Sequence, residues 1–400
     1  MRPYDTPFRK STRRPRILLV TPSSPHAPMN GTQQRTRLLY EGLSRTGEVD
    51  VLGVHQGANR EHQEQQRGYS AQVCWQQDAV GWNKYRPDKN LTLEAETALQ
   101  AKLEEYDLLV GRYLNPICKL QIPDAVPTLV DLDDLRYSHT ARGTGLPLSF
   151  VTALKSRYAA ALAERQLERF DEFFVLSKRD HQQQPGLLTE VLPNIPYRAP
   201  ADPTPPADST QLLFVGALWY GPNRDGIDRF LSKCWPQVHA ALPEATLLLV
   251  GAASPRQRRD WSKHPGVSAP GYVDDLTEVY ERSTAVIAPV YYGGGTNIKV
   301  LEAIAHRRPC ITTPFCHEGL RDTFDGVSDL YVASTNEGFA TACVDLLRAP
   351  DVALARVDYA LTRLSRHYTR GRFVSTVEQT VAHLLNQRRP TPCSRQQATA

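Results

Sequence analysis

Short apolar runs alternate along this chain with longer segments of helical periodicity, and that alternation restricts the fold more than any other feature. The runs include "RILLVT", "VDVLGVH", "PTLV" and "EFFVL" in the first half, and "QLLFV", "ATLLLV" and "AVIAPV" in the second. Continuous apolar runs of this length are typical of strands that are buried on both faces of a parallel sheet. We therefore predict an α/β fold in which helices cover both faces of parallel sheets.

A proline-rich segment divides the chain in two. Residues 193–206 hold six prolines in fourteen positions, which is typical of a linker. Since 400 residues exceed what one hydrophobic core usually serves, we predict two Rossmann-like, doubly wound domains that face each other across a cleft. The predicted parts are a basic N-terminal tail (1–15), an N-terminal domain (16–192), the linker (193–209), a C-terminal domain (210–370), a helix that crosses back to the N-terminal domain (371–387) and a disordered tail (388–400).

The composition, with 41% hydrophobic and 22% charged residues, is that of a soluble globular protein. No apolar run approaches the roughly 20 residues of a membrane-spanning helix. The N-terminus leads into "ILLVT" without the apolar segment of a signal peptide. Seven cysteines without a C-x-x-C pair argue against a disulfide framework and against a structural zinc site. We expect a cytoplasmic protein.

The positive charge is concentrated in the two tails. Residues 1–16 carry six Arg or Lys against one Asp, and residues 388–400 carry three Arg. Such tails are usually solvated, but basic segments also attract proteins to anionic membrane surfaces. Peripheral contact with the inner face of the cytoplasmic membrane is therefore a second expectation, and no nucleic-acid partner is expected.

The stretch "YYGGGTNIKVLEAIA", residues 291–305, joins a predicted strand to a predicted helix through three glycines. A loop in this place presents main-chain N–H groups and the positive end of the helix dipole, where anions bind. Glycines let the backbone approach a ligand closely and permit positive φ angles. We expect an anion site here, with Thr296 or Asn297 as the cap of the helix.

Lys299, Glu302 and His306 share one face of that helix, which we expect to face the loop. Lys299 in the first turn opposes the helix dipole unless an anion is bound, and its hydrogen bond to a phosphate would contribute about 1.5–3 kcal/mol. Glu302 suits a ribose diol. The alternative is an ordinary turn in which Lys299 and Glu302 form a solvated pair worth about 0.2–0.5 kcal/mol. The loop lacks the G-x-G-x-x-G pattern, which disfavours a dinucleotide dehydrogenase.

Three segments and the upstream "VLPN" resemble the donor domain of family-4 retaining glycosyltransferases of the GT-B fold. The segments are "LLFVGALWYGPNRDGIDRF", "GYVDDLTEVYERSTAVIAPV" and "YYGGGTNIKVLEAIAHRRPCITTPF". The N-terminal half resembles the same family more weakly, through "RILLVTPSSPHAPMNGTQQRTRLLYEGLSR". The resemblance implies a UDP- or GDP-sugar donor held by the C-terminal domain. It also implies that the N-terminal domain holds a polysaccharide, glycolipid or lipid-linked acceptor of cell-envelope biosynthesis.

The resemblance also implies roles for individual residues. The group that positions the donor and stabilises charge on the leaving diphosphate would be Lys299, Glu302 and Arg224. The donor-binding residues would be Gly216, Asn223, Tyr272, Val273, Gly294, Gly295, Thr296 and Asn297. The candidates for acceptor binding, in the first loop and near the strand ends of the N-terminal domain, are Gly31, Arg35, Arg112, Asp133 and His139. The alternatives are a rim ion pair for Arg112 and an ordinary surface position for His139.

One departure from the family pattern concerns Gly294. The family often shows two glutamates eight positions apart, and here Gly294 takes the earlier position while Glu302 takes the later one. A subgroup with G-G-T-x-x-K-x-L-E is similar to the present sequence, so we interpret Gly294 as a variant. The course that the resemblance implies is front-side attack with retention, without an enzyme nucleophile, in which a diphosphate oxygen accepts the proton of the acceptor.

The segment "DLDDL", with Asp131, Asp133 and Asp134, resembles the D-x-D metal motif of the other glycosyltransferase fold. Since GT-B enzymes do not generally need that ion, we predict no metal and no other cofactor. Acceptor contact or helix capping is the expected role of these aspartates. Two other functions stay open, a sugar-nucleotide epimerase of the same fold and a non-catalytic subunit that binds a sugar nucleotide.

Overall fold

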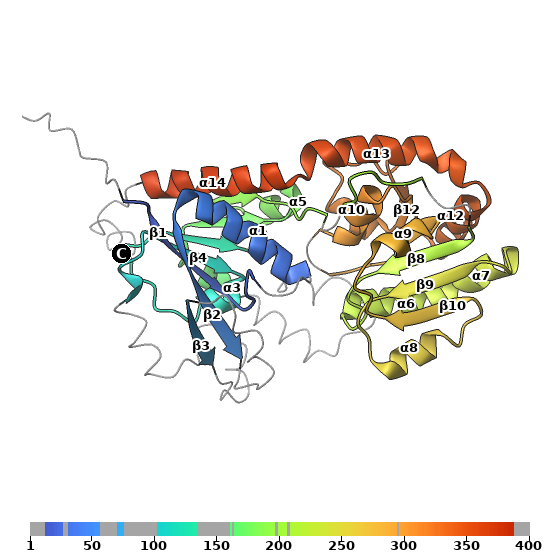
Figure 1. Cartoon of the computed structure of the whole chain (residues 1–400), viewed down its shortest axis with the longest axis horizontal. Helices are drawn as coiled ribbons and strands as arrows, with labels where there is room; N and C mark the ends of the chain where they lie inside the picture. The colour runs from blue at the N-terminus through green and yellow to red at the C-terminus, as the bar shows by residue number, and fades with distance from the viewer. Residues whose placement is uncertain are drawn as a thin grey trace, which may run out of the picture. The chain divides into compact units, whose positions relative to one another are not determined.

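The computed structural model describes residues 13–26, 31–56, 70–75, 102–133, 161, 164–196, 199–205, 209–293 and 296–387 (Figure 1). Contacts between Cα atoms divide the chain into two compact units. One comprises Met1–Leu132, Leu162–Phe174 and Val374–Ala400, and the other comprises Asp133–Ala161 and Val175–Phe373.

The first sheet has seven strands in the order β3-β2-β1-β4-β5-β6-β7, and every pair from β3 to β6 is parallel. The strands are β1 (Arg16–Thr21), β2 (Glu48–Gln56), β3 (Ala71–Trp75), β4 (Leu108–Arg112), β5 (Thr128–Asp131), β6 (Glu172–Val175) and β7 (Thr189–Val191). The central strands β1, β4 and β5 are buried along almost their whole length, as their continuous apolar runs predict.

Helices accompany this sheet at α1 (Gly31–Thr46), α3 (Leu114–Ile117), α5 (Lys178–Gln182) and α14 (Arg370–Asn386). From Val374 onward, α14 belongs to the first unit. A Cβ on Gly42 of α1 would lie 2.7 Å from the Cβ of Val377 in α14, so these two helices approach closely where α1 has no side chain.

The second sheet is parallel throughout, in the order β10-β9-β8-β11-β12-β13. Its strands are β8 (Gln211–Val215), β9 (Thr246–Val250), β10 (Val267–Gly271), β11 (Ala285–Ala288), β12 (Cys310–Thr312) and β13 (Tyr331–Val332). Leu212 and Phe214 of β8 belong to one buried cluster, while Leu213 and Val215 belong to another. Since successive side chains of a strand point to opposite faces, each face of the sheet has its own core.

The helices that accompany the second sheet follow its strands in sequence. They are α6 (Gly221–Lys233), α7 (Trp235–Ala241), α8 (Pro255–Trp261), α9 (Thr277–Glu281), α10 (Ile298–Ala305), α11 (Pro314–Glu318), α12 (Asn336–Arg348) and α13 (Leu354–His367), with the short 3₁₀ helix η4 (Pro350–Ala353) before α13. The segment from Asn223 to Leu242 forms two helices and not one continuous helix, because α6 ends before Cys234 and α7 begins at Trp235. Pro236 lacks the N–H that a continuous helix needs there. The predicted fold class is confirmed: both sheets are parallel and belong to α/β units.

Candidate active site

The strand order of the second sheet reverses between β8 and β11. The chain passes from β8 to β9 and β10 on one side, and then returns to place β11 on the other side of β8. In open parallel sheets, ligands bind outside the carboxyl ends of the strands at such a reversal. The two loops that meet this edge are residues 216–220 after β8 and, after β11, residues 289–293 together with 296–297. They contain Gly216, Thr296 and Asn297 of the predicted donor-binding residues.

Lys299 of α10 is buried in this place and does not face bulk solvent. Its side chain is 8% exposed, and its Nζ lies 5.8 Å from the centre of the Phe214 ring. Burial lowers the pKa of the Lys299 ammonium group. The solvated pair considered for Lys299 and Glu302 is therefore wrong, although Glu302 itself is only partly buried.

Gly216 and Asn223 meet Lys299 at the end of β8. A Cβ on Gly216 would lie 3.2 Å from Nδ2 of Asn223 and 3.6 Å from Cε of Lys299. Asn223 is buried and donates from Nδ2 to the carbonyl oxygen of Ala217 at 2.9 Å. Because Gly216 has no side chain, space remains beside the Asn223 amide and the Lys299 side chain.

The start of α10 has polar groups that the helix itself does not use. Asn297 is the N-cap residue, but its side chain makes no capping hydrogen bond, and its Oδ1 instead accepts one from Lys299 Nζ at 3.3 Å. Thr296 is 7% exposed, and its buried Oγ1 has no hydrogen-bond partner among the described residues. The prediction that one of these side chains caps the helix is therefore wrong. A buried hydroxyl without a partner costs about 1–3 kcal/mol, so a ligand atom that bonds to it would be stabilised.

The beginning of the glycine loop rests on the first turn of α6. Gly293 has a φ of 136°, and a Cβ there would lie 3.3 Å from Cγ of Pro222. The Tyr292 hydroxyl donates to Asp225, the residue whose carboxylate also accepts from Nε and Nη2 of Arg224 at 3.0 and 2.9 Å. This carboxylate raises the pKa of Arg224. Sequence reasoning missed the contact between Tyr292 and Asp225, for which adjacency to the glycines is the only signal.

The structure does not bring every predicted donor residue into this group. Arg224 is partly exposed and pairs with Asp225, outside the cluster of Lys299, Gly216 and Asn223. His306 is 4% exposed and stacks on Tyr280 with ring centres 4.0 Å apart, so the expectation that it faces the loop is wrong. Gly294 and Gly295 lie outside the described residues.

Tyr272 and Val273 follow β10 at the same edge of the sheet. Gly271, which precedes them, has a φ of 104°, and its carbonyl oxygen accepts from the N–H of Gly251 at 2.8 Å. Gly251 in turn approaches Gly216 so closely that a Cβ on Gly251 would lie 1.8 Å from the Gly216 carbonyl oxygen. Tyr272 is 64% exposed, whereas Val273 packs against the buried cluster that contains Val215. Glycines therefore bring the three strand ends together and leave the Tyr272 ring in solvent.

In the N-terminal unit, two of the acceptor candidates are joined by one carboxylate. Arg35 of α1 donates from Nε and Nη2 to Asp131 at 2.9 and 2.6 Å, and Nη1 of Arg112 lies 3.1 Å from the same carboxylate. Arg112 and Asp131 are fully buried and Arg35 is 2% exposed. The ion pair between Arg112 and Asp131 is buried inside the unit, so the exposed ion pair considered for Arg112 is wrong.

The other acceptor candidates are less closely associated. Gly31 begins α1, and Asp133 is half-buried and accepts from Nδ2 of Asn194 at 3.2 Å. His139 lies outside the described residues, as does Asp134. Within the part of the chain that the structure describes, no group of three His, Cys, Asp or Glu side chains could hold a metal ion.

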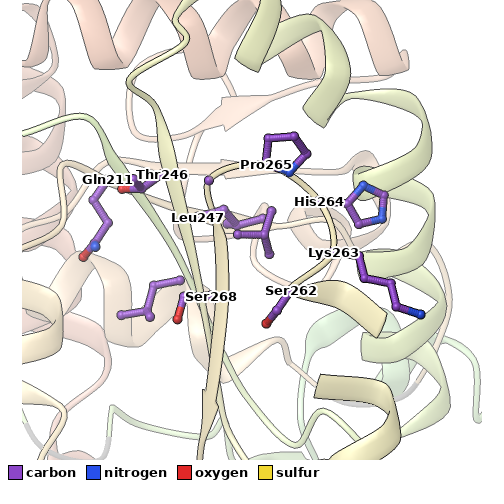
Figure 2. A pocket seen from close by; sticks show the side chains of 11 residues that line it. Gln211, Thr246, Leu247, Ser262, Lys263, His264, Pro265 and Ser268 are labelled. Atoms are coloured by element: carbon purple, nitrogen blue, oxygen red, sulfur yellow. The ribbon is translucent and has the colours of Figure 1, made fainter. Parts of the chain in front are cut away.

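A hollow of about 500 Å³ lies at the opposite edge of the second sheet (Figure 2). Gln211, Thr246 and Val267, which begin β8, β9 and β10, line it together with Lys263 and His264. Lys263 already donates to Asp260 at 2.6 Å. Since ligands of parallel sheets bind at the carboxyl ends, this amino-end hollow is distinct from the candidate active site.

Among the described residues, no helix has the length and apolar character to cross a membrane.

Comparison with known proteins identifies the second unit. Residues 209–349 match the family model described as Glycosyl transferases group 1, whereas no curated protein matches the chain. The fold resembles that of sucrose-phosphate synthase from Thermosynechococcus elongatus, at 18% identity and a TM-score of 0.67 over 93% of this chain and 99% of that one. It also resembles WaaG, a glycosyltransferase involved in lipopolysaccharide biosynthesis, at 16% identity and a TM-score of 0.61 over 92% of this chain and 99% of that one.

A third similar structure is that of HepE from Anabaena in complex with UDP-glucose. It has 14% identity and a TM-score of 0.61 over 92% of this chain and 100% of that one. These likenesses establish the fold, and the family model covers the domain that contains Lys299, Gly216 and Asn223. The chain therefore contains a group 1 glycosyl transferase domain at residues 209–349 and has the fold of GT-B glycosyltransferases.

Proposed function

We propose that the protein transfers a hexose-type sugar from a UDP- or GDP-linked donor to a polysaccharide, glycolipid or lipid-linked acceptor, with retention of anomeric configuration. The observation that carries the donor assignment is the meeting of Lys299, Gly216 and Asn223, together with the buried hydroxyl of Thr296 before α10, which has no partner among the described residues. Support also comes from HepE, whose structures were solved with UDP-glucose and with UDP.

The electrostatics of this group favour a diphosphate. Burial without a carboxylate hydrogen bond destabilises the charged form of Lys299, and a bound phosphate oxygen would reverse that effect by a charge-assisted hydrogen bond. The N-terminal N–H groups of α10 and the hydroxyl of Thr296 would supply further donors to the same anion. Glu302, one turn beyond Lys299, is proposed to bind the ribose.

In the proposed reaction, the acceptor hydroxyl attacks the anomeric carbon from the face that the diphosphate leaves. A diphosphate oxygen takes the proton of that hydroxyl. Lys299 and the α10 amides stabilise the charge that develops on the leaving diphosphate, and Arg224 would assist if it exchanged Asp225 for a phosphate. No metal is required in this scheme, because the ammonium group and the main-chain amides supply the positive charge.

Acceptor binding is proposed for the predicted N-terminal domain, residues 16–192, through Gly31, Arg35, Arg112, Asp133 and His139. The buried positions of Arg35 and Arg112 favour a role in holding the carboxyl edge of the sheet in shape. The basic tail, 1–15, lies almost entirely outside the described residues, and its contact with anionic lipid stays a prediction.

Titration calorimetry with UDP and GDP tests the donor assignment. We expect Lys299→Met to weaken binding of the preferred nucleotide by roughly 10- to 150-fold, the equivalent of one charge-assisted hydrogen bond. Thr296→Val should weaken it to a smaller extent. Lys263→Met, which removes an exposed lysine from the opposite edge of the sheet, is the matched control and should bind as the wild type does. Failure of the wild type to bind either nucleotide would refute the proposal.

A further inference from the structure

Two exposed aromatic side chains lie in loops at the carboxyl edge of the second sheet. Trp219, after β8, is 63% exposed, and Tyr272, after β10, is 64% exposed. Only β9 separates the two strands, so the chain leaves them about 10 Å apart. The other large apolar side chains that are exposed in the described part of the chain do not lie in loops at the carboxyl end of a strand: Leu188, Val327, Val352 and Tyr359.

Trp219 is fixed in place although its ring is in solvent. Its main-chain N–H donates to the carbonyl oxygen of Ala252 at 3.1 Å, which ties it to the end of β9. The ring of Tyr220 meets the indole edge to face, with centres 6.2 Å apart and planes at 78°. Tyr220 also borders the glycine loop, because its hydroxyl lies 3.7 Å from the Cβ position of Gly293. Trp219 is thus a supported aromatic surface beside the candidate active site.

The position of Trp219 relative to Lys299 restricts what the ring can contact. The Lys299 side chain reaches Gly216, which is only three residues before Trp219, so the aromatic segment of Trp219 and Tyr220 follows directly on the proposed diphosphate site in the chain. A nucleoside attached to that diphosphate extends along the sheet edge either toward β9 and β10 or toward β12. Among the described residues, exposed aromatic rings follow strands only on the first of these sides.

We propose that Trp219 is a stacking platform for the nucleobase of the donor, with the Tyr272 ring beyond it on the same side; this inference rests on the proposed function. Bases stack on aromatic side chains through their π faces, which every base has. Trp219 therefore contributes affinity for UDP and GDP alike, and the choice between bases is made elsewhere.

The test compares ligands with and without a base on Trp219→Ala and Trp219→Phe. The dissociation constant of UDP and of GDP is measured by titration calorimetry, and inorganic pyrophosphate is measured as a competitor. For Trp219→Ala we expect nucleotide binding to weaken by roughly 5- to 150-fold, with pyrophosphate binding unchanged. Trp219→Phe should keep most of the affinity, and the fluorescence quenching that the nucleotide causes in the wild type should be lost in it. Tyr359→Ala, which removes another half-exposed ring from α13, is the control and should bind as the wild type does.

Three results would overturn the inference. Nucleotide binding by Trp219→Ala within about twofold of the wild type would exclude stacking. An equal loss of pyrophosphate binding would assign Trp219 to the diphosphate site, and a loss confined to UDP-glucose would assign it to the sugar. If Lys299→Met loses affinity for UDP while Trp219→Ala keeps it, only the inference about Trp219 fails. If the wild type binds neither nucleotide, the proposed function fails as well.

Discussion

Arg308 holds the proline-rich segment in place through Thr204, within the second unit. Its Nη1 donates to the carbonyl oxygen of Thr204 at 2.7 Å, and its Nη2 donates to Oγ1 of the same residue at 3.1 Å. Nε donates to the carbonyl oxygen of Tyr280 at 2.6 Å, and the guanidinium is only 1% exposed. Because these partners are uncharged, burial dominates and lowers the pKa of Arg308 to about 10.

Arg308→Lys is expected to destabilise the protein, since one ammonium group cannot bond to oxygens on both Thr204 and Tyr280. The buried acceptors left without donors should cost about 1–3 kcal/mol each, seen as a lower urea midpoint at unchanged slope. Arg366→Lys, at an exposed position of α13, should stay within about 0.5 kcal/mol of the wild type. Equal midpoints for the two variants would show that the contact between Arg308 and Thr204 is not stabilising.

Gly226 of α6 lies directly against the chain that leads into the glycine loop. A Cβ at this position would be 2.0 Å from the carbonyl oxygen of Pro289, a main-chain atom that cannot rotate away. We expect Gly226→Ala to lower the free energy of unfolding by about 3 kcal/mol, the upper range of overpacking. Gly371→Ala places a methyl group in open space within α14 and should stabilise by about 0.4–1 kcal/mol. Thermal unfolding of both variants gives the comparison, and a stable Gly226→Ala would contradict the close approach.

The buried ammonium of Lys299 makes stability depend on pH. Its pKa in the folded protein is lowered by burial, whereas in the unfolded chain it is about 10.4. Between these two pKa values the unfolded chain binds more protons, so the free energy of unfolding rises as pH rises through this window. In Lys299→Met, urea denaturation from pH 7 to pH 10 should show a flatter dependence. Lys263→Met, with its exposed side chain, should follow the wild type, and a Lys299→Met curve parallel to both would disprove the assignment.

Tyr113 has a backbone conformation that glycine adopts easily and other residues do not. Its φ of 67° and ψ of 151° lie in a region that costs non-glycine residues about 1–3 kcal/mol. The guanidinium carbon of Arg112 lies 3.9 Å from the centre of its ring. Since Tyr113→Gly and Tyr113→Ala both remove the ring, only the backbone term separates them, and the glycine variant should be more stable by about 1–3 kcal/mol.

The same pair of substitutions at Tyr359, within helix α13, should give the opposite order, because glycine is about 1 kcal/mol less favourable than alanine in a helix. Urea denaturation of the four variants measures both differences. If Tyr113→Ala were at least as stable as Tyr113→Gly, the strained conformation of Tyr113 would be wrong.

Local patterns in the sequence determined much of this protein. The apolar runs predict strands that the structure has at β1, β5, β8 and β11, and the glycines predict the passage from β11 to α10. Such features depend on neighbours within a few residues, because burial on both faces and backbone freedom are properties of a short segment. The sequence pattern also predicted that helices would cover both faces of parallel sheets.

The tertiary structure decided which polar groups meet. Arg35, Arg112 and Asp131 come together only because β4 and β5 are parallel neighbours and α1 packs beside them. Lys299 is buried, and not solvated, because its helix returns to the end of β8 at Gly216. Periodicity gives the face of a helix on which a charged side chain lies. What packs against that face depends on strands more than eighty residues away in the sequence. These neighbours decide whether the charge is solvated or buried.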